Sequence, residues 1–348
     1  MNPLLSWGIA PGRQIGDGHP CFIIAEIGSN HDHKYEQALR LIDAAAEAGV
    51  DAVKVQTFRA AQHYSNRAPG FTYLGGRNTF ELIRSLEIDR AWHAPLQAYC
   101  ASRNLIFLSS PCDAAAVDEL HALGMPAFKV ASFDITDLEL IGHMARTGRA
   151  VLLSTGLADW MDIQRAVDAC TATWNSRVAL LQCTSLYPAP VAMANLKAIS
   201  VMRVAFGVVT WYSDHTDGDH VILAAVALGA SIIEKHVTLS RSLPGPDHPF
   251  AMEPPELARM VRKVRDVEAA MGDGRKTGPR TEELEMAEKG RRSLHASRRI
   301  AAGEVITADM LTTKRPGLGI SPHLAHVVLG RVARVDIDAD QWITWDMI

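Results

Sequence analysis

The segment "AFGVVTWYSDHTDGDHVILAAVALGASIIEKHV", residues 205–237, contains the repeating unit of this chain. An apolar run, 205–213, is followed by a helical pattern and then by a second apolar run, 231–237. This order predicts two parallel strands joined by a helix. A histidine lies at the end of each predicted strand, His215 for the first and His236 for the second. The two histidines are therefore candidates for one site.

The same unit recurs along most of the chain. The helical stretches between strands often begin with Asp or Thr and end with Gly, the preferred capping residues. Eight such units predict a closed parallel (β/α)8 barrel, with an open doubly wound sheet as the alternative because strand order cannot be read from sequence. The predicted strands are 22–28, 52–58, 105–110, 127–132, 150–156, 178–184, 205–213 and 231–237.

Three regions are expected along the chain. The barrel is predicted to occupy residues 1–271. The stretch 272–292 is rich in charge and contains glycines, which is typical of a solvated linker, and its acidic middle has room for a short helix. Residues 293–348, with turn signals and short apolar runs, predict a small β-rich domain.

The composition favours an ordinary globular protein. Hydrophobic residues make up 48% of the 348 residues, charged residues 21%, and the net charge is −4. This balance favours neither nucleic acid nor an anionic membrane surface as a partner. The five cysteines are widely spaced and odd in number, and the sequence shows neither a secretory leader nor a long apolar run. We therefore expect reduced thiols in a cytoplasmic protein.

Polar side chains follow nearly every predicted strand, where β/α barrels carry their chemistry. Lys54 and Gln56 share one face of their strand, so both are expected to point into the barrel. A lysine there requires an anionic partner. Lys54 and Lys129, together with serine hydroxyls, predict a site for a small phosphorylated carboxylate. The alternative is that each lysine pairs with an internal carboxylate.

His215 and His236 end successive strands, which are neighbours in a barrel, so their rings are expected to approach a common point. Neutral imidazole suits a divalent transition-metal ion, and two protein ligands leave positions open for water and substrate. Asp214 and Glu234 are expected to orient the imidazoles. The alternative is a pair of structural histidines.

A family resemblance emerges from these segments taken together. The stretches "FIIAEIGSNH", "AGVDAVKVQTF", "FKVAS", "LLSTG", "CTSLYPAP", "SDHT", "LGASIIEKHVT", "GPDH" and "KRPGLGISP" occur in that order. The chain resembles the sialic acid synthases, the NeuB-type nonulosonic acid synthases, from about residue 20 to residue 348.

The resemblance implies a transferase that condenses phosphoenolpyruvate with the open-chain aldehyde of N-acetylmannosamine or a related 2-acetamido or 2,4-diacetamido hexose. The products are a nine-carbon 2-keto-3-deoxy acid and phosphate. The resemblance also implies a barrel followed by an antifreeze-like (SAF) domain, in a homodimer that swaps this domain over the partner's active site.

The resemblance assigns roles to individual residues. The phosphoenolpyruvate site would comprise Lys54, Lys129, Ser132, Ser154 and Ser213, with Ser110 where a threonine is usual. The metal ligands would be His215 and His236, usually described with manganese, with magnesium or cobalt as alternatives. The sugar contacts would be Gln56, Tyr187, Asp247 and Arg315, the last from the other subunit.

Water must also be deprotonated in such a reaction, and Glu26, Asp134 or a metal-bound hydroxide are the candidate bases. The chain departs from the family pattern close to this point. Phe133 and Asp134 stand where glycine and glutamate are usual, "SPCD" (110–113) replaces Thr-Pro-Phe-Asp, and Ser185 replaces a common asparagine. These departures lie near the substrate and leave the sugar open.

Two other functions remain as alternatives. The first is a phosphoenolpyruvate-condensing synthase that acts on a phosphorylated sugar, of the sialic acid 9-phosphate type. The second is a non-catalytic sugar-binding protein built on the tail domain. The histidine pair disfavours the second, because a binding protein has no need for a metal with open positions.

Overall fold

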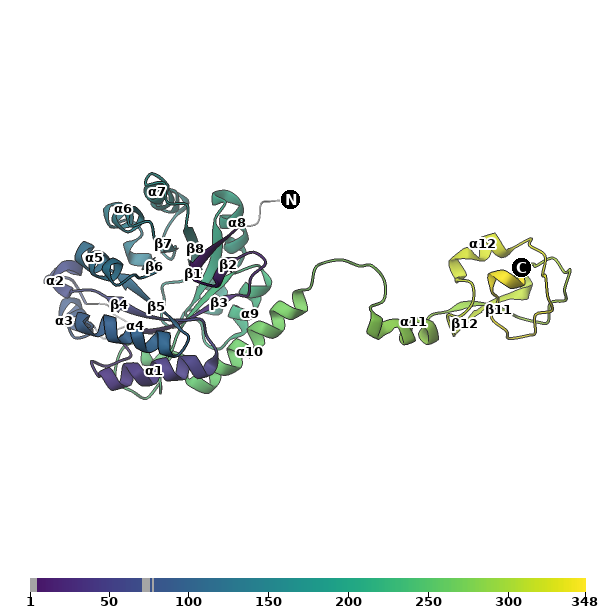
Figure 1. Ribbon diagram of the computed structural model, residues 1–348, viewed down its shortest axis with the longest axis horizontal. Coiled ribbons are helices and arrows are strands. Elements are labelled where there is room, and N and C mark those ends of the chain that lie inside the picture. Colours follow the sequence, from purple (N-terminus) through teal and green to yellow (C-terminus); the bar gives the residue numbers. More distant parts are fainter. Residues whose placement is uncertain (1–4, 71–75, 77) are drawn as a thin grey trace. The chain divides into compact units, whose positions relative to one another are not determined.

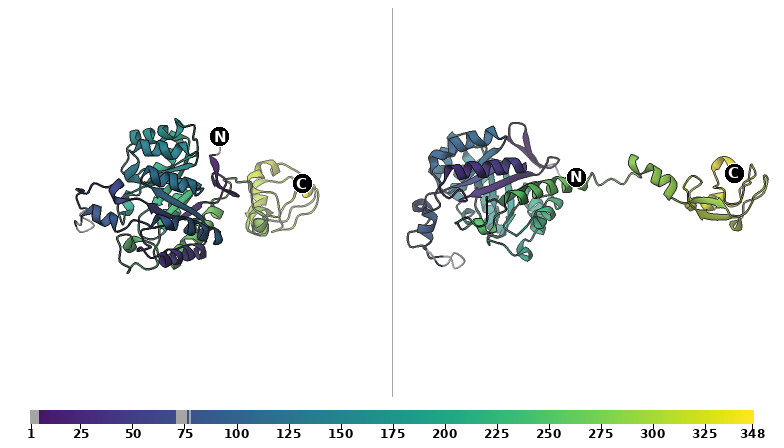
Figure 2. Two further views of the ribbon diagram at one scale, coloured as in Figure 1. Left: turned by 60° about the vertical axis from the view of Figure 1, so that its left-hand side comes forward. Right: turned by 90° about the horizontal axis from the view of Figure 1, so that it is seen from below.

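The structure is a computed structural model that describes residues 5–70, 76 and 78–348. Parallel strands form a closed barrel in the order β10-β3-β4-β5-β6-β7-β8-β9, with helices around it (Figures 1 and 2). The barrel, and not the open sheet, is confirmed because β10 pairs with both β3 and β9. The strands are β3 (Phe22–Gly28), β4 (Ala52–Thr57), β5 (Ile106–Pro111), β6 (Ala127–Val130), β7 (Ala150–Ser154), β8 (Val178–Cys183), β9 (Val209–Asp214) and β10 (Ile232–His236).

The helices between strands bury their apolar faces on the barrel. Capping residues set several of their ends: the Asp113 side chain accepts from the Ala116 N–H at the start of α5, and Gly49, with φ of 81°, ends α1. The helices are α1 (Tyr35–Ala48), α2 (Ala60–His63), α3 (Thr79–Arg84), α4 (His93–Ser102), α5 (Ala114–Ala122), α6 (Leu138–Arg146), α7 (Trp160–Thr171), α8 (Lys197–Phe206), α9 (His220–Ala227) and α10 (Pro254–Met271).

Only β3 has the predicted bounds, and two of the differences at the other strands have a clear structural cause. The strand expected at 205–213 begins only at Val209, because residues 205 and 206 complete α8 and Gly207, with φ of 62°, ends that helix. The strand expected at 127–132 ends at Val130, and a 3₁₀ turn, Ser132–Asp134, follows it. The second change matters for the site, because it turns Ser132 and its neighbours across the barrel mouth.

An N-terminal hairpin, absent from the sequence prediction, closes one end of the barrel. Its strands are β1 (Ser6–Ala10) and β2 (Arg13–Gly16). Ile15 is fully buried in the barrel core, and the Arg13 guanidinium lies 2.9 Å from Asp51, just before β4. The hairpin therefore covers the amino ends of the strands and leaves the carboxyl ends for a site.

The chain divides into two compact units, Met1–Gly272 and Asp273–Ile348. The second unit contains α11 (Leu284–Gly290), β11 (Ser293–Ala296), β12 (Leu311–Lys314) and α12 (Ala325–Val328). Its separate core includes Leu294, Ile300, Ile306, Ile337 and Ile343.

The helix α11, which lies in the predicted linker, is hydrogen-bonded to the rest of the second unit: the Glu288 carbonyl accepts from the Gly317 N–H at 2.6 Å. Among the described residues, no helix combines the length and apolarity that a bilayer span requires.

Candidate active site

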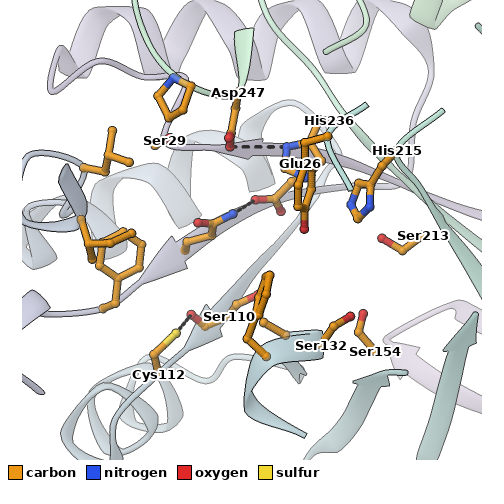
Figure 3. Close-up of a pocket in the computed structure, with 18 of the residues that line it drawn as sticks. Glu26, Ser29, Ser110, Cys112, Ser132, Ser154, Ser213, His215, His236 and Asp247 are labelled. Atoms are coloured by element: carbon orange, nitrogen blue, oxygen red, sulfur yellow. Dashed lines mark hydrogen bonds and ion pairs between the residues drawn. The ribbon is translucent and has the colours of Figure 1, made fainter. Parts of the chain in front are cut away.

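A cavity of about 410 Å³ opens at the carboxyl ends of the barrel strands. Ser154 and His236 are the last residues of β7 and β10, and Figure 3 shows both among the side chains that line the cavity. Most of the predicted site residues meet here. They are Glu26, Lys54, Gln56, Ser110, Lys129, Ser132, Asp134, Ser154, Tyr187, Ser213, His215, His236 and Asp247.

Two lysines and two carboxylates form the polar floor of the cavity. Lys54 forms an ion pair with Glu26, and its Nζ donates to Ser110 Oγ at 3.0 Å. The Glu234 carboxylate lies between the lysines, 3.8 Å from Lys54 Nζ and 3.5 Å from Lys129 Nζ. Both lysines therefore have the internal carboxylate partners that the alternative interpretation required, and these partners line the same cavity.

Burial and the facing charges set the ionisation of this floor. Burial would lower the pKa of Lys54, but Glu234 and Glu26 outweigh it and raise that pKa. Burial would raise the pKa of Glu234, yet Lys129 and Lys54 hold it below its usual value. The pKa of Glu26 is raised, mainly by burial. Lys54 and Glu234 thus remain charged, while Glu26 is the better proton acceptor.

Hydroxyl groups and a backbone N–H face the lysines. Ser213 Oγ donates to Glu234 at 3.0 Å, and Ser132 Oγ accepts from the Gly156 N–H at 3.1 Å. A Cβ at Gly156 would lie 2.5 Å from Ser185 Oγ and 2.8 Å from Ser132 Oγ, so the backbone can approach this closely only as glycine. Because Ser132 Oγ accepts from the backbone here, its own O–H can be donated to an oxygen of a small anion.

The two histidine rings lie side by side, with centroids 5.4 Å apart (Figure 3). His215 Nδ1 donates to the Thr184 carbonyl at 2.7 Å, which leaves Nε2 as the free lone pair. His236 Nδ1 is buried and has no hydrogen-bond partner within the described part of the chain; it lies 3.6 Å from an Asp247 carboxylate oxygen.

Burial keeps both imidazoles neutral. It lowers the pKa of His215 to about 4 and that of His236 well below the usual value, to which His215 also contributes. Neutral rings with available lone pairs are what a divalent metal requires, so His215 and His236 fit a metal site.

Asp214 and Glu234, which were expected to orient the histidines, contact other groups in the structure. Asp214 accepts from the Thr216 hydroxyl and pairs with Lys235 at 2.6 Å, and Glu234 faces the lysines and Ser213. Side-chain alternation explains the correction for Asp214, because it points to the opposite side of β9 from Ser213. The groups that contact the rings are the Thr184 carbonyl and Asp247.

The residues predicted to contact the sugar, other than Arg315, also line the cavity. Gln56 donates to Glu26 at 2.9 Å, and the Tyr187 ring packs 4.3 Å from that of His215. Burial, with Glu26 nearby, raises the pKa of Asp247 to about 7.

Two predicted residues are not among those that line the cavity. Ser185 has a buried hydroxyl behind Gly156. Arg315 belongs to the second unit, where its Nε donates to the Gly290 carbonyl at 2.6 Å.

Sequence reasoning missed one side of the cavity. This apolar wall consists of Phe58, Leu82, Ile83, Leu86 and Phe133. The spacing of Leu82, Ile83 and Leu86 is helical and could have indicated a helix with one apolar face. Its place over the barrel mouth depends on tertiary structure. Cys112 lines the cavity too, as expected for the segment 110–113 near the substrate, whereas His63 lines it and was not predicted.

A closed β/α barrel with two buried lysines and a pair of buried histidines at its carboxyl end has the architecture typical of β/α-barrel enzymes. Comparison with known families narrows the class. Residues 41–276 match the NeuB family, and residues 291–348 match the SAF domain. The chain belongs to the NeuB family, and the resemblance seen in the sequence is confirmed.

Similar proteins span nearly the whole chain. An N,N'-diacetyllegionaminic acid synthase of Campylobacter jejuni is 38% identical over 92% of this chain and 98% of that protein. The N-acetylneuraminate-9-phosphate synthase of Mus musculus is 36% identical over 96% and 94%. The crystal structure of an N-acetylneuraminic acid synthetase from Leptospira borgpetersenii, 32% identical, superposes with a TM-score of 0.75 over 83% of this chain and 97% of that one.

Proposed function

We propose that this chain condenses phosphoenolpyruvate with the open-chain aldehyde of a 2-acetamido or 2,4-diacetamido hexose. The products are a nine-carbon 2-keto-3-deoxy acid and inorganic phosphate. The observation that carries the proposal is that two buried lysines and a pair of neutral histidines line one cavity. Relatives named as synthases of sialic-type acids, similar over nearly the full chain, support it.

The floor of the cavity binds phosphoenolpyruvate. Lys54 and Lys129 supply positive charge, and each ammonium has donors beyond its carboxylate contact. The directional donors come from Ser110, Ser132, Ser154 and Ser213. Because water is largely excluded from this floor, these contacts are stronger than they would be at the surface.

His215 and His236 hold the divalent cation, which we propose to be manganese, with magnesium or cobalt as alternatives. When bound, the cation supplies a Lewis acid beside the aldehyde oxygen. The hydrogen bond from His215 to the Thr184 carbonyl holds that ring in the tautomer that ligation needs. Gln56, Tyr187 and Asp247 line the part of the cavity assigned to the sugar.

The bonds balance as follows. C3 of phosphoenolpyruvate bonds to the aldehyde carbon, and the aldehyde oxygen becomes a hydroxyl group. Water adds to C2 and gives up both of its protons, one of which balances the proton that the aldehyde oxygen takes up. The C2–O bond to phosphate breaks, phosphate leaves with the equivalent of the second proton, and the keto acid remains. Glu26 and Asp134 both line the cavity, and burial is the main reason that the pKa of each is raised. We assign the removal of a proton from water to these two carboxylates.

The apolar wall supports an unphosphorylated amino sugar. Acetamido methyl groups gain free energy when they bury apolar area against Phe58, Leu82 and Phe133. A phosphate group in the same place would lose its hydration against apolar side chains.

We further propose that the chain acts in the cytoplasm as a homodimer in which the SAF domain, 293–348, is exchanged between subunits across the linker, 272–292. Each barrel, 1–271, would then receive Arg315 from its partner. The separate apolar core of the second unit supports an exchange of this kind, because that unit can move without exposing the barrel core.

Phosphate release tests the function. Purified protein with manganese is assayed with phosphoenolpyruvate and, separately, N-acetylmannosamine, its 6-phosphate and 2,4-diacetamido-2,4,6-trideoxyhexoses, and the products are identified by mass spectrometry. We expect turnover with an unphosphorylated sugar. Turnover with the sugar phosphate alone would overturn the substrate class, and sugar binding that never consumes phosphoenolpyruvate would favour a binding protein.

A further inference from the structure

A second group of potential metal ligands lies in the cavity, apart from the histidine pair. It consists of His63 at the end of α2, Cys112 just after β5, and Asp134 in the 3₁₀ turn after β6. One ligand atom from each lies within 4.8 Å of the others, and Cys112 Sγ is 3.8 Å from Asp134 Oδ2. Figure 3 shows Cys112 on the opposite side of the cavity from His215.

We propose that His63, Cys112 and Asp134 bind a soft divalent cation such as Zn²⁺, and that this cation blocks the sugar end of the cavity. Thiolate, imidazole and carboxylate are the donors that zinc prefers, and three protein ligands leave a fourth position for water. The histidine pair lacks a thiolate, so the two sites differ in chemistry: a harder ion such as manganese prefers sites without sulfur.

The geometry requires a small adjustment. Bonds of about 2.0 to 2.3 Å in a tetrahedral site place the ligand atoms roughly 3.3 to 3.7 Å apart. The three ligand atoms of the present group lie within 4.8 Å of one another, so their widest separation exceeds the tetrahedral one by about 1 Å at most. All three residues are half-buried and line the cavity, so a cation can reach them from the cavity without opening the fold. The ligands come from three separate segments: the end of α2, the residue after β5 and the 3₁₀ turn after β6.

Asp134 is the acidic partner of Cys112 in this group, and the positive charges of Lys54 and Lys129 also act on the two residues. The thiol of Cys112 lies beside the carboxyl group of Asp134, and burial, together with Asp134, raises the pKa of Cys112 well above its usual value. The thiol therefore keeps its proton until a metal ion displaces it to water. A bound Zn²⁺ would neutralise the thiolate and the carboxylate together.

The inhibitory effect rests on the proposed function. Asp134 is one of the two groups assigned to the proton of water, and a cation coordinated to it would remove it from that role. The adjacent Phe133 belongs to the apolar wall assigned to the sugar. We therefore expect the soft cation to compete with the sugar and not with manganese.

Cadmium binding tests the site without reference to turnover. Protein saturated with manganese is titrated with Cd²⁺, and the ultraviolet charge-transfer absorption of a cadmium thiolate is recorded. We expect one equivalent to bind, the band to disappear in Cys112→Ser, and affinity to fall about tenfold or more in His63→Ala.

The matched control is Cys183→Ser, because that thiol lines the same cavity and lies 3.0 Å from Ser132 Oγ. The band should persist in this variant. A band that survives in Cys112→Ser, or that Cys183→Ser removes, would overturn the site. Circular dichroism and retained manganese binding show that each variant is folded.

Zinc inhibition tests the consequence. Phosphate release is measured with saturating manganese and buffered Zn²⁺, each variant relative to its own zinc-free rate. We expect inhibition competitive with the sugar, and a half-inhibitory zinc concentration about tenfold higher or more in Cys112→Ser. Inhibition that excess manganese relieves, unchanged in Cys112→Ser, would place zinc at the histidine pair and overturn the proposal. A failure of turnover with every sugar would count against the proposed function, whereas the cadmium titration would still test the site.

Discussion

Several residues in this cavity have pKa values that differ from those of the same groups in water. His215 and His236 are neutral because burial disfavours their charged forms, and the pKa of Asp247 rises to about 7 for the same reason. Lys54 stays charged because it has two carboxylate partners. The cavity thus combines two neutral histidines, proposed as metal ligands, with a charged lysine that is proposed to bind an anion.

Replacing either histidine by alanine is expected to abolish metal-dependent turnover. Each change removes a proposed ligand, so we expect manganese affinity to fall by about 100-fold or more, as measured by isothermal titration calorimetry. Far-UV circular dichroism should be unchanged. His121→Ala, at an exposed position on α5, is the control and should bind manganese normally. Near-normal activity in both His215→Ala and His236→Ala would contradict their assignment as ligands.

The two lysines are expected to respond differently to replacement by methionine. Lys54→Met leaves Glu26 without its ion-pair partner and should cost about 3 to 5 kcal/mol of unfolding free energy. Lys129→Met should cost less, because its contact with Glu234 is longer and Lys54 still faces that carboxylate.

Both variants should raise KM for phosphoenolpyruvate by about tenfold or more. Chemical denaturation measures the first effect and steady-state kinetics the second. An unchanged KM in Lys129→Met would show that this lysine does not contact the substrate.

Secondary-structure elements position these residues through strand register and tight turns. Glu26 pairs in register with both Lys54 and His236, so three neighbouring strands bring a carboxylate, a lysine and a metal-ligand candidate together. The turn after β7 brings the Gly156 N–H to Ser132. The loop between β7 and α7, residues 155–159, is short, so a change in this turn moves the donor directly.

Gly156→Ala is expected to disrupt the anion-binding floor. The added Cβ would lie 2.5 to 2.8 Å from Ser185 Oγ, Cys183 Sγ and Ser132 Oγ, so the turn or these side chains must move. We expect KM for phosphoenolpyruvate to rise about tenfold or more while the fold is kept. Gly142→Ala, inside α6, is the control: it has no contact closer than 3.4 Å and should slightly stabilise the helix. Equal kinetics in the two variants would argue against a role for this turn.

The whole molecule consists of two units with separate cores, and the proposed function requires both. All the cavity-lining residues belong to the first unit, and Arg315 belongs to the second. A domain-swapped dimer would therefore build each complete site from two chains, which makes the arrangement testable by complementation.

Co-expression of Lys129→Met with Arg315→Ala is expected to restore activity. At phosphoenolpyruvate concentrations well below KM, each variant alone should keep about a tenth of wild-type activity or less. A swapped heterodimer contains one intact barrel with an intact Arg315, so a random mixture should recover about a quarter of wild-type activity. The control pairs Lys129→Met with Gly156→Ala, both in the barrel, in which each barrel carries a defect and no recovery is expected. Absence of recovery in the first mixture, despite heterodimers detected by mass spectrometry, would show that Arg315 does not act across subunits.

Much of the fold could be predicted because its signals are local. Apolar runs, capping residues and glycine stops along the chain determined the barrel strands, although the strand before His215 began later than expected because α8 continued to Phe206. The β1–β2 hairpin was missed because its residues alternate too briefly to stand out. Its contacts with Ile15 and Asp51 exist only once the barrel has formed.

By itself, the sequence determined the repeating β-α unit, and with it which side chains would stand at the carboxyl ends of the strands. Only the tertiary structure decided which of those side chains meet. It turned Asp214 away from the histidines, placed Glu234 between the lysines, and brought Cys112 to Asp134. The reason is that strand order and loop conformation determine distances between residues far apart in the chain, and no local pattern encodes those distances.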